Sequence, residues 1–374
     1  MSLYNQPNFR LHWTCNSPSH YNDFLFRALH KSDFIDLLVH YRDIFLSSHP
    51  WKTTLRVGYN SRIQDRILKI DLFLMKRAII DKGCVFVLGS WADTTSVLLI
   101  IICILLNRKY ILWTDTPNIN RKRRWFLSIP RTIFLHIAFR RACTILCTGT
   151  PAIDVLCKMG AAEKKVVNFP CWVDIDVYRP QPLRQSVQSN SFIRFVSSGR
   201  VLNFLKGHDL AIRSLAKAFE QAPEVNFEYL IAGTGPDVEK LKELAERLGI
   251  GEKVKVLGWI EPNDLVKVFH KSDVLIHPSP THDAYGVAVI EAMAAGMIVL
   301  SSDTTYAGLD RIKHGVNGFI HSAGNVDELA SQIVWLLSHP DQIHVIKSEA
   351  RKTAELWPVS KGVAIVENIL QAFT

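Results

Sequence analysis

The stretch from His282 to Gly296, HDAYGVAVIEAMAAG, brings two carboxylates, a glycine and the start of a helix close together. Directly before it, DVLIHP at residues 273–278 is a short apolar run closed by a proline, which is typical of a buried strand. From Val287 the residues are mostly small or apolar helix formers, and Gly296 stands where such a helix ends. The stretch therefore predicts a strand, a loop that holds Asp283, and a helix that carries Glu291.

The start of this helix predicts the kind of ligand that binds beside it. A helix that begins near Gly286 directs its free backbone N–H groups and the positive end of its dipole into the preceding loop. Helix starts of this kind commonly bind phosphate and other anions. We therefore expect an anionic ligand beside Asp283.

Length and composition indicate a globular protein of two domains. The chain has 374 residues, of which 48% are hydrophobic and 21% are charged, and a chain of this length exceeds one ordinary core. The formal charge of +9 permits contact with phosphates, anionic lipids or nucleic acid and selects none of them. Seven cysteines without a CxxC pair indicate neither a disulfide framework nor a zinc site. The amino terminus does not resemble a signal peptide, so we expect a cytoplasmic protein.

Two segments raise the question of membrane contact. Residues 97–106 are wholly apolar, but ten residues cannot span a bilayer core of about 30 Å, so we interpret them as the buried helix of a βαβ unit. Arg121–Arg124 precede two aromatic residues, a pattern typical of segments at a membrane surface. A solvated basic face has the same pattern. We favour peripheral contact with the inner face of the plasma membrane.

Strands and helices alternate along both halves, which predicts α/β domains with mostly parallel sheets. In the first half we expect helices over 20–45, 97–106 and 151–159, strands over 84–89, 110–113, 143–147 and 165–169, and either type over 67–73. In the second half we expect strands over 192–196, 226–231, 253–257, 274–277 and 297–300, and helices over 208–220, 237–248 and 262–270.

The polar residues 179–191 have no periodicity and predict a linker between the two domains. The predicted division is an amino-terminal domain over 1–178, a carboxyl-terminal domain over 192–357, and a last helix over 358–374 that packs back on the first domain. Ligands of such sheets bind at the carboxyl ends of the strands, here in a cleft between the halves.

Two further loops at predicted strand ends carry residues suited to binding phosphate. Residues 197–208 supply Arg200 and Lys206 after Gly199, and two cations there suit a diphosphate, although solvated surface charges look the same. Residues 232–236 supply the Gly233–Gly235 turn, whose glycines let the backbone approach a ligand closely. A plain turn is the alternative.

Taken in order, these motifs resemble the retaining glycosyltransferases of the GT-B fold, family 4. That family has two glutamates separated by seven residues; here Asp283 stands in the first position and Glu291 in the second, with Gly286 matched. The resemblance covers residues 141–374 and has further matches at Gly199–Arg200, Lys206–Gly207, Gly233–Pro236, His314–Phe319 and Pro170–Asp174. It implies two Rossmann-like domains that face each other across a cleft.

The resemblance also implies a role for each matched residue. Arg200 and Lys206 bind the diphosphate of a nucleotide-sugar donor, Glu291 binds the ribose hydroxyls, and Asp283 binds hydroxyls of the donor sugar. A solvated helix glutamate is the alternative for Glu291, and Asp283 is one methylene, or about 1.5 Å, shorter than the usual glutamate. Further donor contacts are expected from Gly199, Gly233, Thr234, Gly235, Tyr285, Gly286 and Val287.

The reaction implied is transfer of a sugar with retention of its anomeric configuration, by front-side attack with the leaving phosphate as base. No cofactor or metal is expected, because the histidines are scattered and have no ligand spacing. The amino-terminal domain should bind a glycan or lipid-linked acceptor, with Trp91 and Asp115 as candidate contacts. A helix N-cap is the alternative for Asp115.

We expect a glycosyltransferase of surface polysaccharide or glycoconjugate biosynthesis that uses a UDP-sugar, or alternatively GDP-mannose. The first rival is a glycogen- or sucrose-synthase-like enzyme, which shares the carboxylate pair. The second is a catalytically silent nucleotide-sugar-binding protein, a hypothesis raised by the aspartate at position 283. A nucleic-acid binder is disfavoured because no basic and aromatic repeat accompanies the charge.

Overall fold

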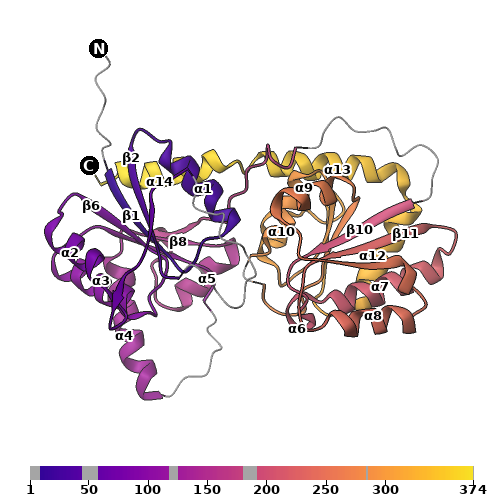
Figure 1. Ribbon diagram of the computed structural model, residues 1–374, viewed down its shortest axis with the longest axis horizontal. Coiled ribbons are helices and arrows are strands. Elements are labelled where there is room, and N and C mark those ends of the chain that lie inside the picture. Colours follow the sequence, from indigo (N-terminus) through magenta and orange to yellow (C-terminus); the bar gives the residue numbers. More distant parts are fainter. Residues whose placement is uncertain (1–8, 44–57, 118–124, 180–191, 284, 374) are drawn as a thin grey trace, which may run out of the picture. The chain divides into compact units, whose positions relative to one another are not determined.

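The structure is a computed structural model that describes residues 9–43, 58–117, 125–179, 192–283 and 285–373 (Figure 1). The chain divides into two compact units. The N-terminal unit consists of residues 1–172 and 359–374, and the C-terminal unit consists of residues 173–358. The division lies a few residues before the predicted end of the first domain at 178. Most of the predicted linker and the whole basic segment Arg121–Arg124 lie outside the described residues.

The N-terminal unit is built on a sheet of seven parallel strands. In spatial order the strands are β3 (Ser61–Ile63), β2 (Ile35–Tyr41), β1 (Phe9–Cys15), β6 (Cys84–Leu88), β7 (Tyr110–Thr114), β8 (Thr144–Cys147) and β9 (Val166–Asn168). A separate antiparallel hairpin pairs β4 (Arg66–Ile67) with β5 (Ile70–Asp71). The helices are α1 (His20–His30), α2 (Leu72–Ile80), α3 (Thr94–Leu105), α4 (Trp125–Arg141), α5 (Thr150–Lys158) and α14 (Val359–Gln371), with a short 3₁₀ helix at Glu163–Lys165.

Four helices of this unit share one hydrophobic core with the middle strands. Buried residues of α2, α3, α4 and α5 pack on β6, β7 and β8. The carboxylates of Asp71 and Asp93 begin α2 and α3 by accepting hydrogen bonds from backbone N–H groups of the first turn. The last helix, α14, drawn in yellow in Figure 1, contacts α1, and Ser32 donates a hydrogen bond to Glu367 across a Oγ–Oε1 distance of 2.6 Å.

The C-terminal unit has a sheet of six parallel strands. In spatial order they are β12 (Val254–Gly258), β11 (Asn226–Ala232), β10 (Phe192–Ser198), β13 (Val274–His277), β14 (Ile298–Ser302) and β15 (Phe319–His321). In chain order this is 3-2-1-4-5-6, the strand order of a Rossmann fold. The helices are α6 (Asn203–Lys206), α7 (His208–Gln221), α8 (Val238–Arg247), α9 (Pro262–His270), α10 (Val287–Ala294), α11 (Tyr306–Arg311), α12 (Val326–Ser338) and α13 (Pro340–Glu355), with a 3₁₀ helix at Gly251–Lys253.

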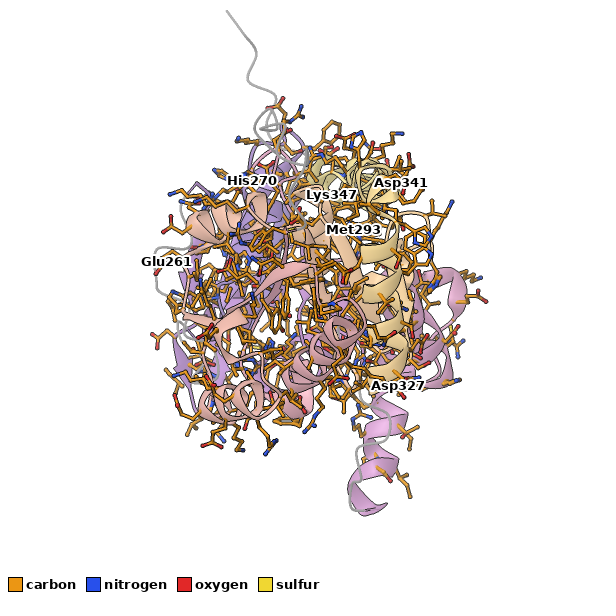
Figure 2. The ribbon with its side chains drawn as sticks, turned by 90° about the vertical axis from the view of Figure 1, so that its right-hand side faces the viewer. Glu261, His270, Met293, Asp327, Asp341 and Lys347 are labelled. Atoms are coloured by element: carbon orange, nitrogen blue, oxygen red, sulfur yellow. The ribbon has the colours of Figure 1, made fainter. Side chains whose placement is uncertain are left out.

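Helix α10 lies in the interior of the C-terminal unit. Seven of its eight residues, from Ala288 to Ala294, are buried. It packs against α13, the helix that carries Lys347, and its Met293 is fully buried (Figure 2). A helix buried in this way holds its first residue in a fixed place, which matters for the loop that precedes it.

The predicted α/β class and the parallel sheets are confirmed, and the predicted strands of the second half agree with the structure to within a few residues. Three predictions for the first half were wrong or incomplete. The helix predicted over 20–45 ends at His30, because residues 35–41 form β2 between β1 and β3. The central strand β1 was not predicted. Residues 67–73 are neither one helix nor one strand, since they hold the end of the hairpin and the start of α2.

The apolar run 97–106 does form the helix of a βαβ unit, α3. However, α3 is buried on one side only, since Leu99, Ile100 and Cys103 are buried whereas Ile101 and Leu105 are exposed. The predicted burial was therefore wrong for half of the helix, because a helix on a sheet contacts its neighbours along one face. Across the described residues, none of the helices is both long enough and apolar enough to cross a membrane.

Candidate functional site

The candidate site lies where the strand order of the C-terminal unit reverses. Strands β10 and β13 are parallel neighbours, and the chain crosses from β10 to one side of the sheet and from β13 to the other. The two loops that leave these strands, residues 199–207 and 278–286, therefore diverge at the carboxyl edge of the sheet. A reversal point of this kind is where open α/β sheets bind their ligands.

Three side chains converge on the carboxylate of Asp283 at this point. The ammonium group of Lys206 forms an ion pair with its Oδ2 atom. His277 Nε2 lies 2.8 Å from the same oxygen, and Ser279 Oγ donates to it across 3.3 Å. Lys206 ends α6, His277 ends β13 and Ser279 follows it, so both diverging loops contribute. The structure thus brings together two residues predicted from the sequence, Lys206 and Asp283.

The electrostatics of this cluster keep Asp283 ionised. Burial raises the pKa of its carboxyl, but the positive charge of Lys206 and the hydrogen bond from His277 outweigh burial and hold that pKa well below its usual range. Burial lowers the pKa of His277, against the opposing effect of Asp283, so this imidazole is neutral at pH 7 and its Nε2–H donates to Asp283. The cluster is therefore one cation, one anion and two neutral donors, His277 and Ser279.

The same loop ends at the first turn of α10. Gly286 caps this helix with a φ of +80°, a left-handed conformation that favours glycine. A Cβ atom at this position would lie 2.4 Å from Cγ2 of Thr305, so even alanine requires a shift. Glycine thus lets the chain turn from Asp283 into α10 while it packs on the neighbouring loop. The helix start directs positive partial charge toward the cluster.

Backbone contacts tie the four strand-end loops into one surface. Val201 N–H donates to the carbonyl of Thr234 across 2.8 Å, which joins the loop after β10 to the Gly233–Gly235 turn after β11. Asp283 N–H donates to the carbonyl of Thr304 across 3.2 Å, which joins the loop after β13 to the loop after β14. The loops that hold the predicted donor-binding residues are therefore positioned by one another as well as by the sheet.

Glu291, the second carboxylate of the motif, is buried and not solvated. Only 3% of its surface is exposed, so the alternative of a solvent-facing glutamate is wrong. The hydroxyl of Tyr178 donates to its Oε1 atom across 2.8 Å. Burial, together with the nearby Glu291 carboxylate, raises the pKa of Tyr178 well above its ordinary value, so the phenol stays protonated and remains a donor. Glu291 is thus held by a residue from the start of the unit.

The remaining predicted residues of the C-terminal unit lie in the same loops. Arg200 and Val287 are half-buried, Thr234 is exposed, and Tyr285 is buried with its hydroxyl 3.1 Å from Nη2 of Arg311. The backbone carbonyl of Arg200 accepts a hydrogen bond from Nε2 of His208 across 3.2 Å. Burial is the main cause that lowers the pKa of His208 to about 4, so this imidazole is also neutral.

The two predicted acceptor-side residues belong to the N-terminal unit. Trp91 is half-buried and stacks edge to face with Phe139 at 5.5 Å between ring centroids. Asp115 is exposed, and its Oδ1 atom accepts a hydrogen bond from Thr148 across 3.3 Å. The alternative of a helix N-cap at Asp115 is wrong, because the next two residues, Thr116 and Pro117, are not helical.

Three residues that contact the two carboxylates were not predicted from the sequence. His277 and Ser279 stand in the predicted strand end and the loop after it, and Tyr178 stands at the predicted domain boundary. The one available signal was the position of His277, a polar residue at the last position of an otherwise apolar strand. No local pattern points to Tyr178, since it lies 113 positions before Glu291 in the sequence.

Comparison with known proteins shows the class to which this fold and site belong. The structure of HepE from Anabaena in complex with UDP superposes with a TM-score of 0.77 over 97% of this chain and 100% of that chain, at 18% identity. An uncharacterized glycosyltransferase of Haemophilus influenzae is 25% identical over 71% of this chain and 70% of its own length. The chain has the GT-B fold, with two Rossmann-like domains.

The match to a family of known proteins lies in the C-terminal half of the chain. Residues 183–353 match the family model of the glycosyl transferases group 1. An uncharacterized glycosyltransferase of Methanocaldococcus jannaschii is 34% identical over 152 residues, which are 40% of this chain. The match spans 37% of the length of that relative, well under half. The similarity to glycosyltransferases of the GT-B fold that the strand-end motifs predicted is therefore confirmed.

Proposed function

We propose that the protein is a glycosyltransferase that moves a sugar from a nucleotide-sugar donor to a hydroxyl group of an acceptor. The observation that carries this proposal is the cluster of Lys206, Asp283 and His277 at the reversal point of a Rossmann-type sheet, in front of the first turn of α10. The cluster offers a cation and helix N–H groups for a diphosphate beside an ionised carboxylate for sugar hydroxyls.

In this proposal Lys206, Arg200 and the start of α10 bind the diphosphate. The departing nucleoside diphosphate gains negative charge as the glycosidic bond breaks, so cations and N–H dipoles at that place stabilise the transition state more than the ground state. No metal is included, because these groups already supply positive charge. Activity that requires a divalent cation and is lost in EDTA would contradict this part.

Asp283 has a defined task in the same proposal. Its carboxylate is ionised and can only accept hydrogen bonds, which suits the hydroxyl groups of a sugar. His277 and Ser279 hold one of its oxygens, so the shorter side chain at this position is fixed in orientation. When a donor binds, Lys206 would share its charge between Asp283 and the phosphates. The carboxylate thus also positions the lysine.

Glu291 would bind the ribose hydroxyls of the nucleotide, with its carboxylate orientated by Tyr178. The donor we favour is a UDP-sugar, because the similar HepE structure contains UDP, and GDP-mannose is the second choice. We further propose transfer with retention to a glycan or lipid-linked acceptor that the N-terminal unit binds, in surface polysaccharide or glycoconjugate biosynthesis.

The test is a donor panel of UDP-, GDP- and ADP-sugars, with donor hydrolysis and calorimetric binding of the free nucleotides as readouts. We expect turnover and binding with one nucleotide, and weaker nucleotide binding in Lys206→Ala. Lys217→Ala is the matched control, since Lys217 forms an exposed ion pair with Asp327 of the same unit; Asp327 is labelled in Figure 2. Binding without turnover of any donor would favour the catalytically silent protein, and neither binding nor turnover would refute the proposal.

A further inference from the structure

The outer faces of α2, α3 and α4 in the N-terminal unit are unusually apolar. On α4, Ile129, Ile133 and Ile137 follow one another at intervals of four residues and are all exposed, Ile133 to 57%. The opposite side of the same helix, with Leu135 and Phe139, is buried in the core. The three isoleucines thus form a stripe that points away from the sheet.

The neighbouring helices extend this stripe. Ile79 and Ile80 are exposed at the end of α2, and Leu105 and Leu106 are exposed at the end of α3, Leu105 to 76%. The exposed large apolar side chains recorded on these helices are all isoleucine or leucine. Exposing such side chains to water costs about 25 cal/mol per Å² of apolar surface. Exposed apolar residues on three neighbouring helices therefore indicate a binding surface.

The carboxyl ends of the three helices lie together. Arg108, which follows α3, donates through Nε to the carbonyl of Ala78 across 2.9 Å and through Nη2 to the carbonyl of Ile79 across 2.6 Å. Arg141, at the end of α4, donates to the side-chain oxygen of Asn107 across 3.3 Å. These bonds join the carboxyl ends of α2, α3 and α4, and we name the exposed isoleucines and leucines of these three helices the apolar face.

Charge identifies the partner that suits this face. The residues of the N-terminal unit include 25 Lys and Arg but 12 Asp and Glu, an excess of 13 positive charges. The C-terminal unit has 19 against 23, an excess of 4 negative charges, and the two together give the +9 of the chain. Neither α3 nor α4 contains an acidic residue, and the exposed Arg140 and Arg141 end α4.

We propose that the apolar face docks on a membrane surface that contains anionic lipids. Aliphatic side chains enter the boundary between headgroups and acyl chains, while Arg140 and Arg141 at the end of α4 meet the negative headgroups. The first turns of α4 project from the rest of the unit in both views (Figures 1 and 2), so this helix is accessible to a flat surface. A second copy of the chain fits less well, because it would bring two strongly basic units together.

Flotation with lipid vesicles tests this proposal without reference to glycosyl transfer. We expect the full chain to float with vesicles of phosphatidylcholine and phosphatidylglycerol at low salt, and to bind vesicles of phosphatidylcholine alone far less. Binding should fall in about 1 M NaCl, where the Debye length is about 3 Å. Ile133→Gln/Ile137→Gln should reduce binding about tenfold or more, and Arg140→Gln/Arg141→Gln about fivefold per residue.

The matched control is Val316→Gln/Val345→Gln, which removes two apolar residues of similar exposure from the C-terminal unit. It should float like the wild type, and thermal unfolding should show that all variants are folded. The proposal is overturned if the chain ignores anionic vesicles, or if the isoleucine variant binds them as the wild type does. Concentration-dependent dimers that the isoleucine variant abolishes, without vesicle binding, would assign the face to a second copy instead.

Discussion

The two units share a parallel sheet with helices on it, yet they use charge in opposite ways. In the C-terminal unit a small number of charges meet inside a largely buried cluster, where Lys206 and His277 contact one carboxylate. In the N-terminal unit positive charges exceed negative ones by 13, and the exposed Arg140 and Arg141 end a helix that also exposes three isoleucines. A net charge of +9 therefore describes neither unit, because the partly buried Lys206 acts on one ligand whereas surface cations act together on an extended one.

The largest expected effect is on the rate of sugar transfer when Lys206, the partly buried cation of the cluster, is replaced. Lys206→Ala should lower kcat for sugar transfer by about 10²- to 10³-fold, because it removes positive charge from the place where the leaving group becomes more negative. Lys217→Ala, which removes an exposed lysine of the same unit, should change kcat less than about twofold. Steady-state kinetics with the active donor provides the measurement. Equal effects of both substitutions would remove the distinction between buried and surface charge.

The next effect concerns the backbone that presents the cluster. Gly286→Ala should destabilise the protein by about 2–4 kcal/mol, because a left-handed conformation and a close contact with Thr305 act together. Gly249→Ala is the matched control: Gly249 has a φ of +72° but open space around it, so about 1 kcal/mol is expected. Chemical denaturation would compare the two. Equal losses of stability in the two variants would mean that the contact with Thr305 does not add to the cost of the left-handed conformation.

The smallest effect concerns buried histidines, which both units contain. Burial, the largest cause in each case, lowers the pKa of His12 in the N-terminal unit and of His208 in the C-terminal unit to about 4. Between pH 6.5 and 4 the unfolded chain therefore binds more protons than the folded one, and stability falls as the pH falls through this range. Each histidine should contribute a loss of about 1 kcal/mol between pH 7 and 5.5.

His12→Asn and His208→Gln retain an N–H donor but do not titrate. Denaturation curves at several pH values should show a weaker dependence of the free energy of unfolding on pH for each variant than for the wild type. A dependence that both variants leave unchanged would mean that these imidazoles titrate in the folded protein as they do in water. A change in one variant only would show that the two units differ in how they bury their histidines.

The sequence was more informative about the C-terminal unit than about the N-terminal one. The strands over 226–231 and 274–277 were predicted almost to the residue, because short apolar runs there end at glycine or proline. The interior strand β1, FRLHWTC, was not predicted, although its apolar residues alternate with Arg10, His12 and Thr14 as in a strand with one apolar face. Residues 35–41 were taken for helix, since an apolar run of that length fits a helical face as well as a strand.

The sequence by itself determined the alternation of strands and helices, the loop that carries Asp283, and Lys206 as a candidate cation. Short-range patterns suffice for these, because glycine, proline and apolar periodicity act within a few residues. Only the tertiary structure decided that Lys206, His277 and Ser279 share one carboxylate oxygen, and that Tyr178 holds Glu291. It also decided which side of α3 stays exposed. Contacts between distant segments depend on strand order and helix packing, which no local pattern specifies.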